Sequence, residues 1–245
     1  MKFSKILLIA LMSVVFVACN FKEEIYFNED GTGKMSISFE GGELMQMLPD
    51  SDSLQIQKAI DSTIVFKHML SENKDSIAQL SQEQQAKLKR LEPFSLHMKV
   101  EPENGVMNFD MFTDFQDVSE MNAAFNTFQN ASSIGPFAGG RPMPVNSTKE
   151  STEVNYSFKR NKFKRKTVIL NQELFEKSLD SLGSAEMFLS SSRYTFKYHF
   201  PRRVKSTNIE EATFSMDGKT MIHEVDFLEM MRDPESIVIE VELEK

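Results

Sequence analysis

Residues 23–40 read Glu-Glu-Ile-Tyr-Phe-Asn-Glu-Asp-Gly-Thr-Gly-Lys-Met-Ser-Ile-Ser-Phe-Glu, and this stretch decides the fold. Met35, Ile37 and Phe39 alternate with polar residues, which is typical of a strand that buries one face. An Asp-Gly turn separates this run from an earlier one at 24–28, which favours a β-hairpin. Because strict alternation leaves the other face in water, the pattern predicts antiparallel sheet and not a parallel α/β fold.

The same alternation recurs along the rest of the chain, at residues 96–100, 107–111, 154–158, 163–170, 194–200, 212–216, 219–225 and 237–243. Helices are expected between these hairpins. Ser81, Asp117 and Asn171 precede apolar helical patterns as capping residues, and a further helix is expected over 43–60, broken at Pro49. The sequence therefore predicts an α+β fold in which antiparallel sheets built from hairpins carry a few covering helices.

The N-terminus has the order of an export signal. Lys2 and Lys5 precede an apolar run from Ile6 to Ala18, and Cys19, the only cysteine of the chain, follows. This run of thirteen residues is too short for a membrane-spanning helix, which needs about 20, but it fits the apolar segment of a signal peptide. Phe16-Val17-Ala18-Cys19 resembles the lipobox of bacterial lipoproteins, with Phe16 in place of the usual Leu. The alternative is an ordinary secretory signal with an unmodified cysteine.

The lipoprotein resemblance implies that residues 1–18 are removed and that Cys19 carries acyl chains in a membrane. It implies an outer-membrane location, in either the periplasmic or the surface-facing leaflet. Lys22-Glu23-Glu24 resembles the signal that sends Bacteroidota lipoproteins to the cell surface, although it lies about one residue late. The alternative for these three residues is a charged lead-in to the first strand.

Composition limits the classes of function. Without Lys2 and Lys5, the chain has 26 basic and 36 acidic residues, a net charge of −10. Nucleic acid is therefore not an expected partner. A single cysteine allows no internal disulfide, so packing must hold the 227 residues that follow the signal. Residues 132–147 are rich in Gly, Pro and Ser and predict a loop or linker between an N-terminal half (19–131) and a C-terminal half (148–245). The two halves can also form one domain.

A group of basic residues stands out in this acidic chain and is the sharpest binding-site hypothesis. If two stretches meet at one end of a sheet, they can bind an anion on a lipid headgroup, a glycan or an acidic protein. The alternative is a solvated hairpin tip whose charges prevent edge pairing. The residues are Lys159, Arg160, Lys162, Lys164, Arg165, Lys166, Arg202, Arg203 and Lys205.

Catalytic and metal-binding patterns do not emerge from the sequence. The four histidines are scattered, and exposed strand positions explain them without a metal. Asn28, Asp30 and Thr32 imitate the first half of a calcium loop, but the twelfth position is Phe39, so a hairpin turn explains them better. The aromatic stripe 194–200 is explained by core packing, with an apolar ligand groove as the alternative.

The leading interpretation is a non-enzymatic binding or envelope-accessory lipoprotein that needs no cofactor and no metal. A partner would be a lipid, a glycan or an envelope protein. The alternatives are an envelope hydrolase whose site the sequence does not reveal, and a purely structural envelope protein. Residues 23–33 and Tyr-His-Phe-Pro-Arg-Arg-Val at 198–204 resemble uncharacterised Bacteroidota lipoproteins and LppM-like lipoprotein domains, a resemblance that implies a fold class only.

Overall fold

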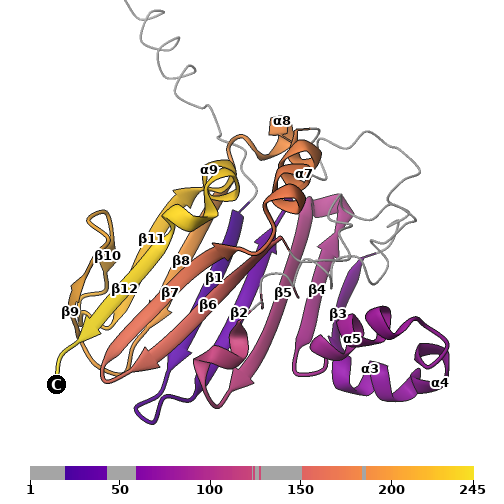
Figure 1. The fold of residues 1–245 in the computed structure, drawn as a ribbon, viewed down its shortest axis with the longest axis horizontal. Helices are drawn as coiled ribbons and strands as arrows, with labels where there is room; N and C mark the ends of the chain where they lie inside the picture. Colours follow the sequence, from indigo (N-terminus) through magenta and orange to yellow (C-terminus); the bar gives the residue numbers. More distant parts are fainter. Residues whose placement is uncertain (1–19, 43–58, 123, 125–126, 128–150, 184–185) are drawn as a thin grey trace, which may run out of the picture.

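The computed structural model describes residues 20–42, 59–122, 124, 127, 151–183 and 186–245. It contains an eight-stranded sheet in the order β10-β11-β8-β1-β2-β5-β4-β3 and a four-stranded sheet in the order β6-β7-β12-β9. The two sheets pack in layers, with the four-stranded sheet in front in Figure 1. The predicted α+β class is confirmed.

The strands of the eight-stranded sheet are β1 (Asn20–Phe27), β2 (Gly33–Glu40), β3 (Ile60–Val65), β4 (Ser95–Glu101), β5 (Val106–Phe115), β8 (Arg193–His199), β10 (Thr213–Phe214) and β11 (Thr220–Asp226). The four-stranded sheet consists of β6 (Thr152–Lys159), β7 (Lys162–Ile169), β9 (Val204–Thr207) and β12 (Val238–Leu243). The hairpin from which the sequence argument began forms as expected, with Ile25 opposite Met35. In its turn Asp30 Oδ1 accepts the Thr32 N–H at 3.0 Å, and Gly31 has φ +86°.

The helices are α3 (Phe66–Glu72), α4 (Lys74–Ile77), α5 (Gln82–Arg90), α7 (Gln172–Leu182), α8 (Glu186–Leu189) and α9 (Phe227–Arg232), with 3-10 turns η1 (Pro102–Asn104), η2 (Val118–Met121) and η4 (Pro234–Ser236). All three predicted caps are confirmed. Ser81 and Gln84 form a reciprocal capping box at α5, Asp117 and Glu120 form one at η2, and Asn171 accepts the Leu174 N–H at α7. These side chains satisfy backbone donors that the first turn leaves unpaired.

One strand pair departs from the antiparallel expectation. β1 lies between β2, which is antiparallel to it, and β8, which is parallel to it with Ile25 opposite Tyr198. A parallel pair needs a long crossover, and here the crossover is the chain between residues 27 and 193. Side chains alternate between the two faces of a strand in parallel and antiparallel pairs alike. The alternation in the sequence therefore did not indicate that β1 would pair in parallel with β8.

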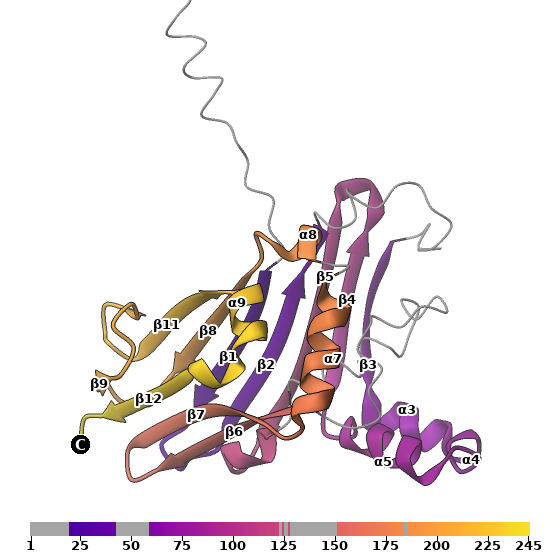
Figure 2. The same ribbon diagram turned by 45° about the horizontal axis from the view of Figure 1, so that its top comes forward.

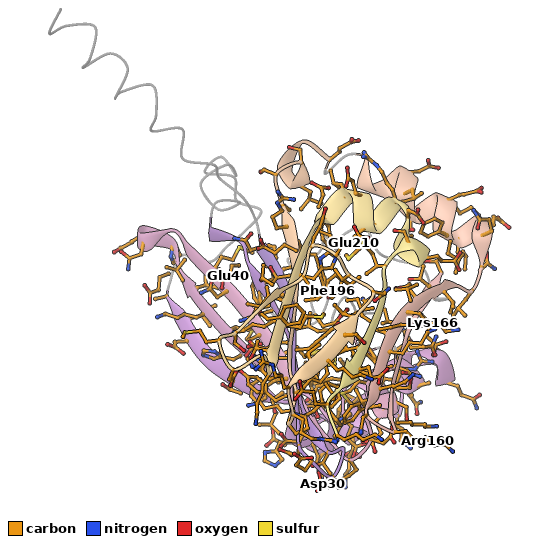
Figure 3. All side chains as sticks on the ribbon, turned by 90° about the vertical axis from the view of Figure 1, so that its left-hand side faces the viewer. Asp30, Glu40, Arg160, Lys166, Phe196 and Glu210 are labelled. Carbon is orange, nitrogen blue, oxygen red and sulfur yellow. The ribbon has the colours of Figure 1, made fainter. Side chains whose placement is uncertain are left out.

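The core lies between the two sheets. Tyr194, Phe196, Tyr198 and Phe200 are all buried, so the core interpretation of this stripe is confirmed and it lines no groove. The ring of Phe163 on β7 lies 4.9 Å from that of Tyr198 on β8, which joins the layers. Figure 3 views the two layers from the side, with Phe196 between them. Helix α9 closes one end, where the Phe227 ring stacks on Phe21 at 4.2 Å, and Figure 2 shows α7 on the same side of the large sheet.

Strands β3 and β9 were not expected. Ile60–Val65 is a strand at the edge of the large sheet, and only its first residue falls within the helix predicted over 43–60. Ala59 is not helical, and residues 43–58 of that predicted helix lie outside the described residues. Conversely, the run 212–216 gives only the two-residue strand β10. Edge strands have one neighbour, so pairing depends on the tertiary fold more than on their own pattern.

Both halves of the chain contribute to the large sheet. β1 to β5 precede residues 132–147 and β8, β10 and β11 follow them, while the small sheet uses only strands from the C-terminal side. The predicted linker, residues 1–18 and Cys19 lie outside the described residues. In the described part of the chain, no helix is long and apolar enough to cross a bilayer.

Candidate functional site

Several turns that are distant in the sequence meet at one end of the molecule. Arg202 Nη2 donates to Asn161 Oδ1 at 2.8 Å, and Arg202 Nε lies 3.2 Å from Glu29 in the β1–β2 turn. Arg203 accepts the Glu244 N–H through its carbonyl at 2.9 Å. Figure 3 shows Arg160 and Asp30 together at this end, which we call the basic pole and define by Arg160, Asn161, Arg202, Arg203 and Lys205.

The basic pole borders an open hollow of about 490 Å³. Acidic side chains of β12 and the residues after it line it together with the basic ones. Lys205 Nζ donates to Glu242 at 2.6 Å, and Lys162 Nζ lies 3.5 Å from the same carboxylate. The hollow is lined by Arg160, Asn161, Lys205, Glu242, Leu243, Glu244 and Lys245. Part of the basic charge predicted to bind a partner is thus already balanced within the protein.

The other predicted basic residues lie in three different places. Lys159 and Lys162 face each other at the end of the β6–β7 hairpin beside the basic pole. Lys164 lies farther along β7 and donates to Glu240 at 2.5 Å, and Lys166 lies farther still, opposite Val238. Arg165 does not lie on this surface, because alternation along β7 turns it into the core, where it is 3% exposed. The other eight residues lie at the surface, seven of them exposed and Arg202 half-buried, and they remain a predicted contact.

Arg160 is held in an unusual backbone conformation. Arg160 has φ +52° and Asn161 has φ +65°, at the two central positions of the hairpin turn. Such turns favour Asn and Gly, because other residues meet steric strain with positive φ. The hairpin therefore presents the Arg160 side chain at its tip at some cost in stability.

A second cluster of charge, which the sequence did not reveal, is buried between the sheets. Arg165 Nε donates to both carboxylate oxygens of Glu23 at 3.3 Å, and Glu23 is 0% exposed. The hydroxyl of Tyr198 donates to Glu23 at 2.6 Å and that of Tyr194 does so at 3.2 Å. The guanidinium lies 4.6 Å from the centre of the Phe196 ring, a cation–π distance.

The electrostatics of this cluster favour the charged form of Arg165 and the neutral form of the tyrosines. Burial lowers the pKa of Arg165, but the charge of Glu23 and the surrounding tyrosine hydroxyls together outweigh burial, and the pKa of Arg165 is raised. Burial, and after it the negative charge of Glu23, raise the pKa of Tyr194 and Tyr198 well above the ordinary value. The arrangement keeps the tyrosines as neutral donors to Glu23 and joins β1, β8 and β7, and no described hollow reaches it.

The outer face of the large sheet carries a network around Glu24. Its carboxylate accepts from Lys22 at 3.0 Å, Lys197 at 2.9 Å, His199 at 2.8 Å and the Tyr26 hydroxyl at 2.9 Å. The Tyr26 ring stacks on His199 with centroids 3.9 Å apart. Burial raises the pKa of Glu24, but these hydrogen bonds outweigh burial and lower its pKa to about 2.

Glu24→Gln is expected to weaken the dependence of the free energy of unfolding on pH in the acidic range. The pKa of Glu24 is lower in the folded protein, so the carboxylate stabilises the fold above about pH 4.5, and this stabilisation is lost as the pH falls through about 2. At neutral pH we expect a loss of about 1–2 kcal/mol, since solvent screens part of the network. Urea unfolding between pH 2 and 7 measures both effects. Glu224→Gln, on the same face, is the control, and an unchanged acidic pH dependence in Glu24→Gln contradicts the prediction.

The structure places Lys22-Glu23-Glu24, which the sequence analysis interpreted as an export signal or a charged lead-in to the first strand. These residues are not a free segment before the first strand but lie within β1. Lys22 and Glu24 face outward into the network, and Glu23 faces the core. The sequence signal for this role is Glu23 itself, an acidic residue on the same strand face as Phe21 and Ile25.

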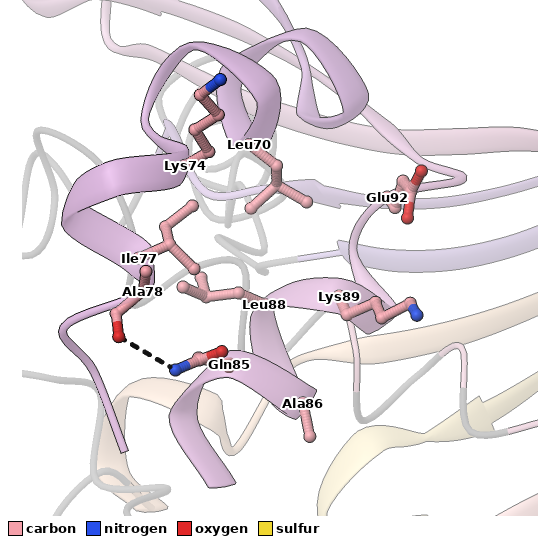
Figure 4. A pocket seen from close by; sticks show the side chains of 9 residues that line it. All are labelled: Leu70, Lys74, Ile77, Ala78, Gln85, Ala86, Leu88, Lys89 and Glu92. Carbon is pink, nitrogen blue, oxygen red and sulfur yellow. Dashed lines mark hydrogen bonds between the residues drawn. The ribbon is translucent and has the colours of Figure 1, made fainter. Parts of the chain in front are cut away.

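A second hollow lies among the helices, and its lining lacks the converging polar groups of an enzyme site. It measures about 330 Å³ between α3, α4 and α5 (Figure 4). Leu70, Ile77 and Leu88 form its apolar part, and Gln85 Nε2 donates to the Ala78 carbonyl at 3.4 Å. Lys74 and Lys89 are ordinary exposed lysines with no carboxylate paired across the hollow. Polar groups do not converge here as they do in a ligand-binding cleft.

The described residues contain no group of three or more His, Cys, Asp and Glu side chains placed to hold a metal ion. His97 approaches Asp61 at 3.0 Å and His199 approaches Glu24, so both have carboxylate partners. His223 differs from the expected exposed position. It is 8% exposed on the inner face of β11, and burial lowers its pKa.

Comparison with known proteins gives one structural similarity. No family model matches this sequence, and no curated protein matches it. Among solved structures, the chain is similar to the folded domain of the Mycobacterium tuberculosis protein LppM, determined by NMR. The sequences are 8% identical, the match covers 92% of this chain and 88% of that one, and the TM-score is 0.38. A similarity at this level supports no conclusion about function.

Proposed function

We propose that this protein is a lipid-anchored cell-envelope lipoprotein that acts by binding and not by catalysis. Acyl chains on Cys19 hold it in the outer membrane, and the basic pole meets an anionic partner. The observation that carries the proposal is the gathering of Arg160, Arg202, Arg203 and Lys205 at one end of the molecule by turns that are hydrogen-bonded to one another. Loops held by a rigid scaffold are where binding residues concentrate.

The position of β1 supports this arrangement. Asn20, the residue after Cys19, is already paired with Glu40 on one side and Arg193 on the other. β1 then runs to the turn that contains Glu29, at the basic pole. A strand of this length spans about 26 Å. A lipid on Cys19 therefore joins the body at one end of the sheet, without a spacer, and the basic pole lies at the other end.

Mass spectrometry of the N-terminal peptide from isolated membranes tests the anchor. We expect a peptide that begins at an acylated Cys19, and Cys19→Ala is expected to leave the signal uncleaved and the cysteine adduct absent. Protease treatment of intact cells then decides the leaflet, since only protein in the surface-facing leaflet is digested. An unmodified Cys19 in the mature protein refutes the anchor.

Charge reversal tests the binding function. The purified acylated protein in detergent is titrated with polyglutamate and, separately, with polyphosphate at low salt. Arg160→Glu combined with Arg203→Glu is expected to weaken binding at least about tenfold, because charge complementarity is lost. Lys74→Glu combined with Lys89→Glu, on the distant helices, makes the same change in net charge and is the control. Equal weakening by both pairs refutes a specific basic pole.

A further inference from the structure

The turn between β10 and β11 (residues 215–219) is fixed beside the basic pole by hydrogen bonds. Ser215 closes it twice: its carbonyl accepts the Gly218 N–H at 2.8 Å, and its hydroxyl donates to Asp217 at 2.5 Å. The Lys219 N–H donates to the same Asp217 carboxylate at 3.0 Å. Lys219 also donates through Nζ to the Pro201 carbonyl at 2.9 Å, which fixes this turn to the one that carries Arg202 and Arg203.

This rigid turn presents two apolar side chains to solvent. Met216 is 103% exposed and Phe214 is 45% exposed. A single exposed apolar residue is ordinary on a protein surface, so its exposure alone has little meaning. Here both residues lie in one short hairpin whose backbone is held by side-chain hydrogen bonds. Burying such side chains in a partner is favourable, and the hydrogen-bonded backbone of the turn has little conformational freedom left to lose.

Arg203 is packed against the same turn. A Cβ atom on Gly218 would lie 2.8 Å from Arg203 Cγ and 2.9 Å from its Nε, so only glycine allows this approach. Gly218 also has φ +69° and accepts the Val204 N–H at 2.9 Å. The exposed Arg203 side chain is therefore held beside the turn that carries Met216. Methionine, aromatic residues and arginine are the types enriched at the centres of protein–protein interfaces.

We infer that Phe214, Met216 and Arg203 form a docking knob for a second protein, one that offers an apolar socket with acidic residues at its rim. This proposal deepens the proposed function and rests on it, because the anchor at Cys19 makes the basic pole face away from the membrane. A protein fits better than a lipid surface or a glycan, because acidic residues are interleaved with the basic ones. An anionic bilayer or polyanion matches the basic residues but leaves Glu29, Asp217, Glu242 and Glu244 unmatched, whereas a protein surface can match a mixed pattern of charge.

Photo-crosslinking in living cells tests the docking knob on the full chain. Met216→p-benzoyl-phenylalanine places the reactive group at the tip of the turn, and Leu80→p-benzoyl-phenylalanine places it at an exposed apolar position on the helical side of the molecule. We expect one discrete protein adduct from position 216 that is absent from position 80. Adding Arg203→Glu is expected to reduce the adduct at least about tenfold. Mass spectrometry identifies the molecule that is attached.

The other outcomes refute the docking knob. They are a lipid or glycan adduct alone, an adduct with a second copy of this chain alone, no adduct, and an adduct that Arg203→Glu leaves unchanged. The thermal unfolding midpoint of each variant is measured as well, and Lys205→Glu serves as a second charge reversal at the basic pole that does not touch the turn. The same cells report on Cys19 acylation, so a failed anchor is distinguished from an acylated protein whose knob has no protein partner.

Discussion

Arg165→Met is expected to lower the free energy of unfolding by about 3–5 kcal/mol, because it leaves the carboxylate of Glu23 buried without its positive partner. Glu23 and Arg165 are 0% and 3% exposed, so water cannot replace the lost contact. The hydroxyls of Tyr194 and Tyr198 still donate to Glu23, but neutral donors do not compensate a buried charge fully. Urea unfolding at neutral pH measures the loss.

Two further variants identify the cause. Lys164→Met breaks the exposed pair with Glu240 on the same strand and is expected to cost less than about 1 kcal/mol. Glu23→Met combined with Arg165→Met removes both charges and is expected to be more stable than Arg165→Met alone. If Arg165→Met costs as little as Lys164→Met, the buried pair does not hold the two sheets together as we describe.

Phe163→Ala is expected to cost about 3–5 kcal/mol, the range for deleting a large buried aromatic side chain. Phe163 is 1% exposed and lies between the layers. Its ring centre is 4.9 Å from that of Tyr198, 5.2 Å from that of Phe27 and 5.8 Å from that of Phe200. The loss has two parts, the transfer of the ring to water and the cavity that rigid neighbours leave open. Thermal or urea unfolding measures it.

Phe214→Ala is the matched control for Phe163→Ala, because it is the same substitution at a half-exposed position of a two-residue strand. We expect it to lower the free energy of unfolding by less than about 1 kcal/mol. Both variants delete the same ring, so the difference between them measures the effect of burial. A similar cost for both variants contradicts the assignment of Phe163 to the core between the sheets.

The candidate site was predictable only in part. The sequence singled out Arg160, Arg202 and Arg203 because basic residues are conspicuous in an acidic chain. It did not separate Arg165 from its neighbours, since the alternation that turns this residue inward was hidden by the run of charges. Nor did it find Met216 and Phe214, which it placed in a longer strand with a buried face. Burial and pairing across the fold, and not residue type, distinguish these positions.

By itself, the sequence determined the local features of this protein. Alternation fixed most of the strands, Asp-Gly chemistry fixed the turn before Gly33, and Ser81, Asp117 and Asn171 fixed the starts of helical turns, because these effects act within a few residues. The tertiary structure alone decided that β1 lies parallel to β8, that Arg165 meets Glu23, and that four separate turns meet at the basic pole. These depend on contacts between residues far apart in the chain, which no local pattern encodes.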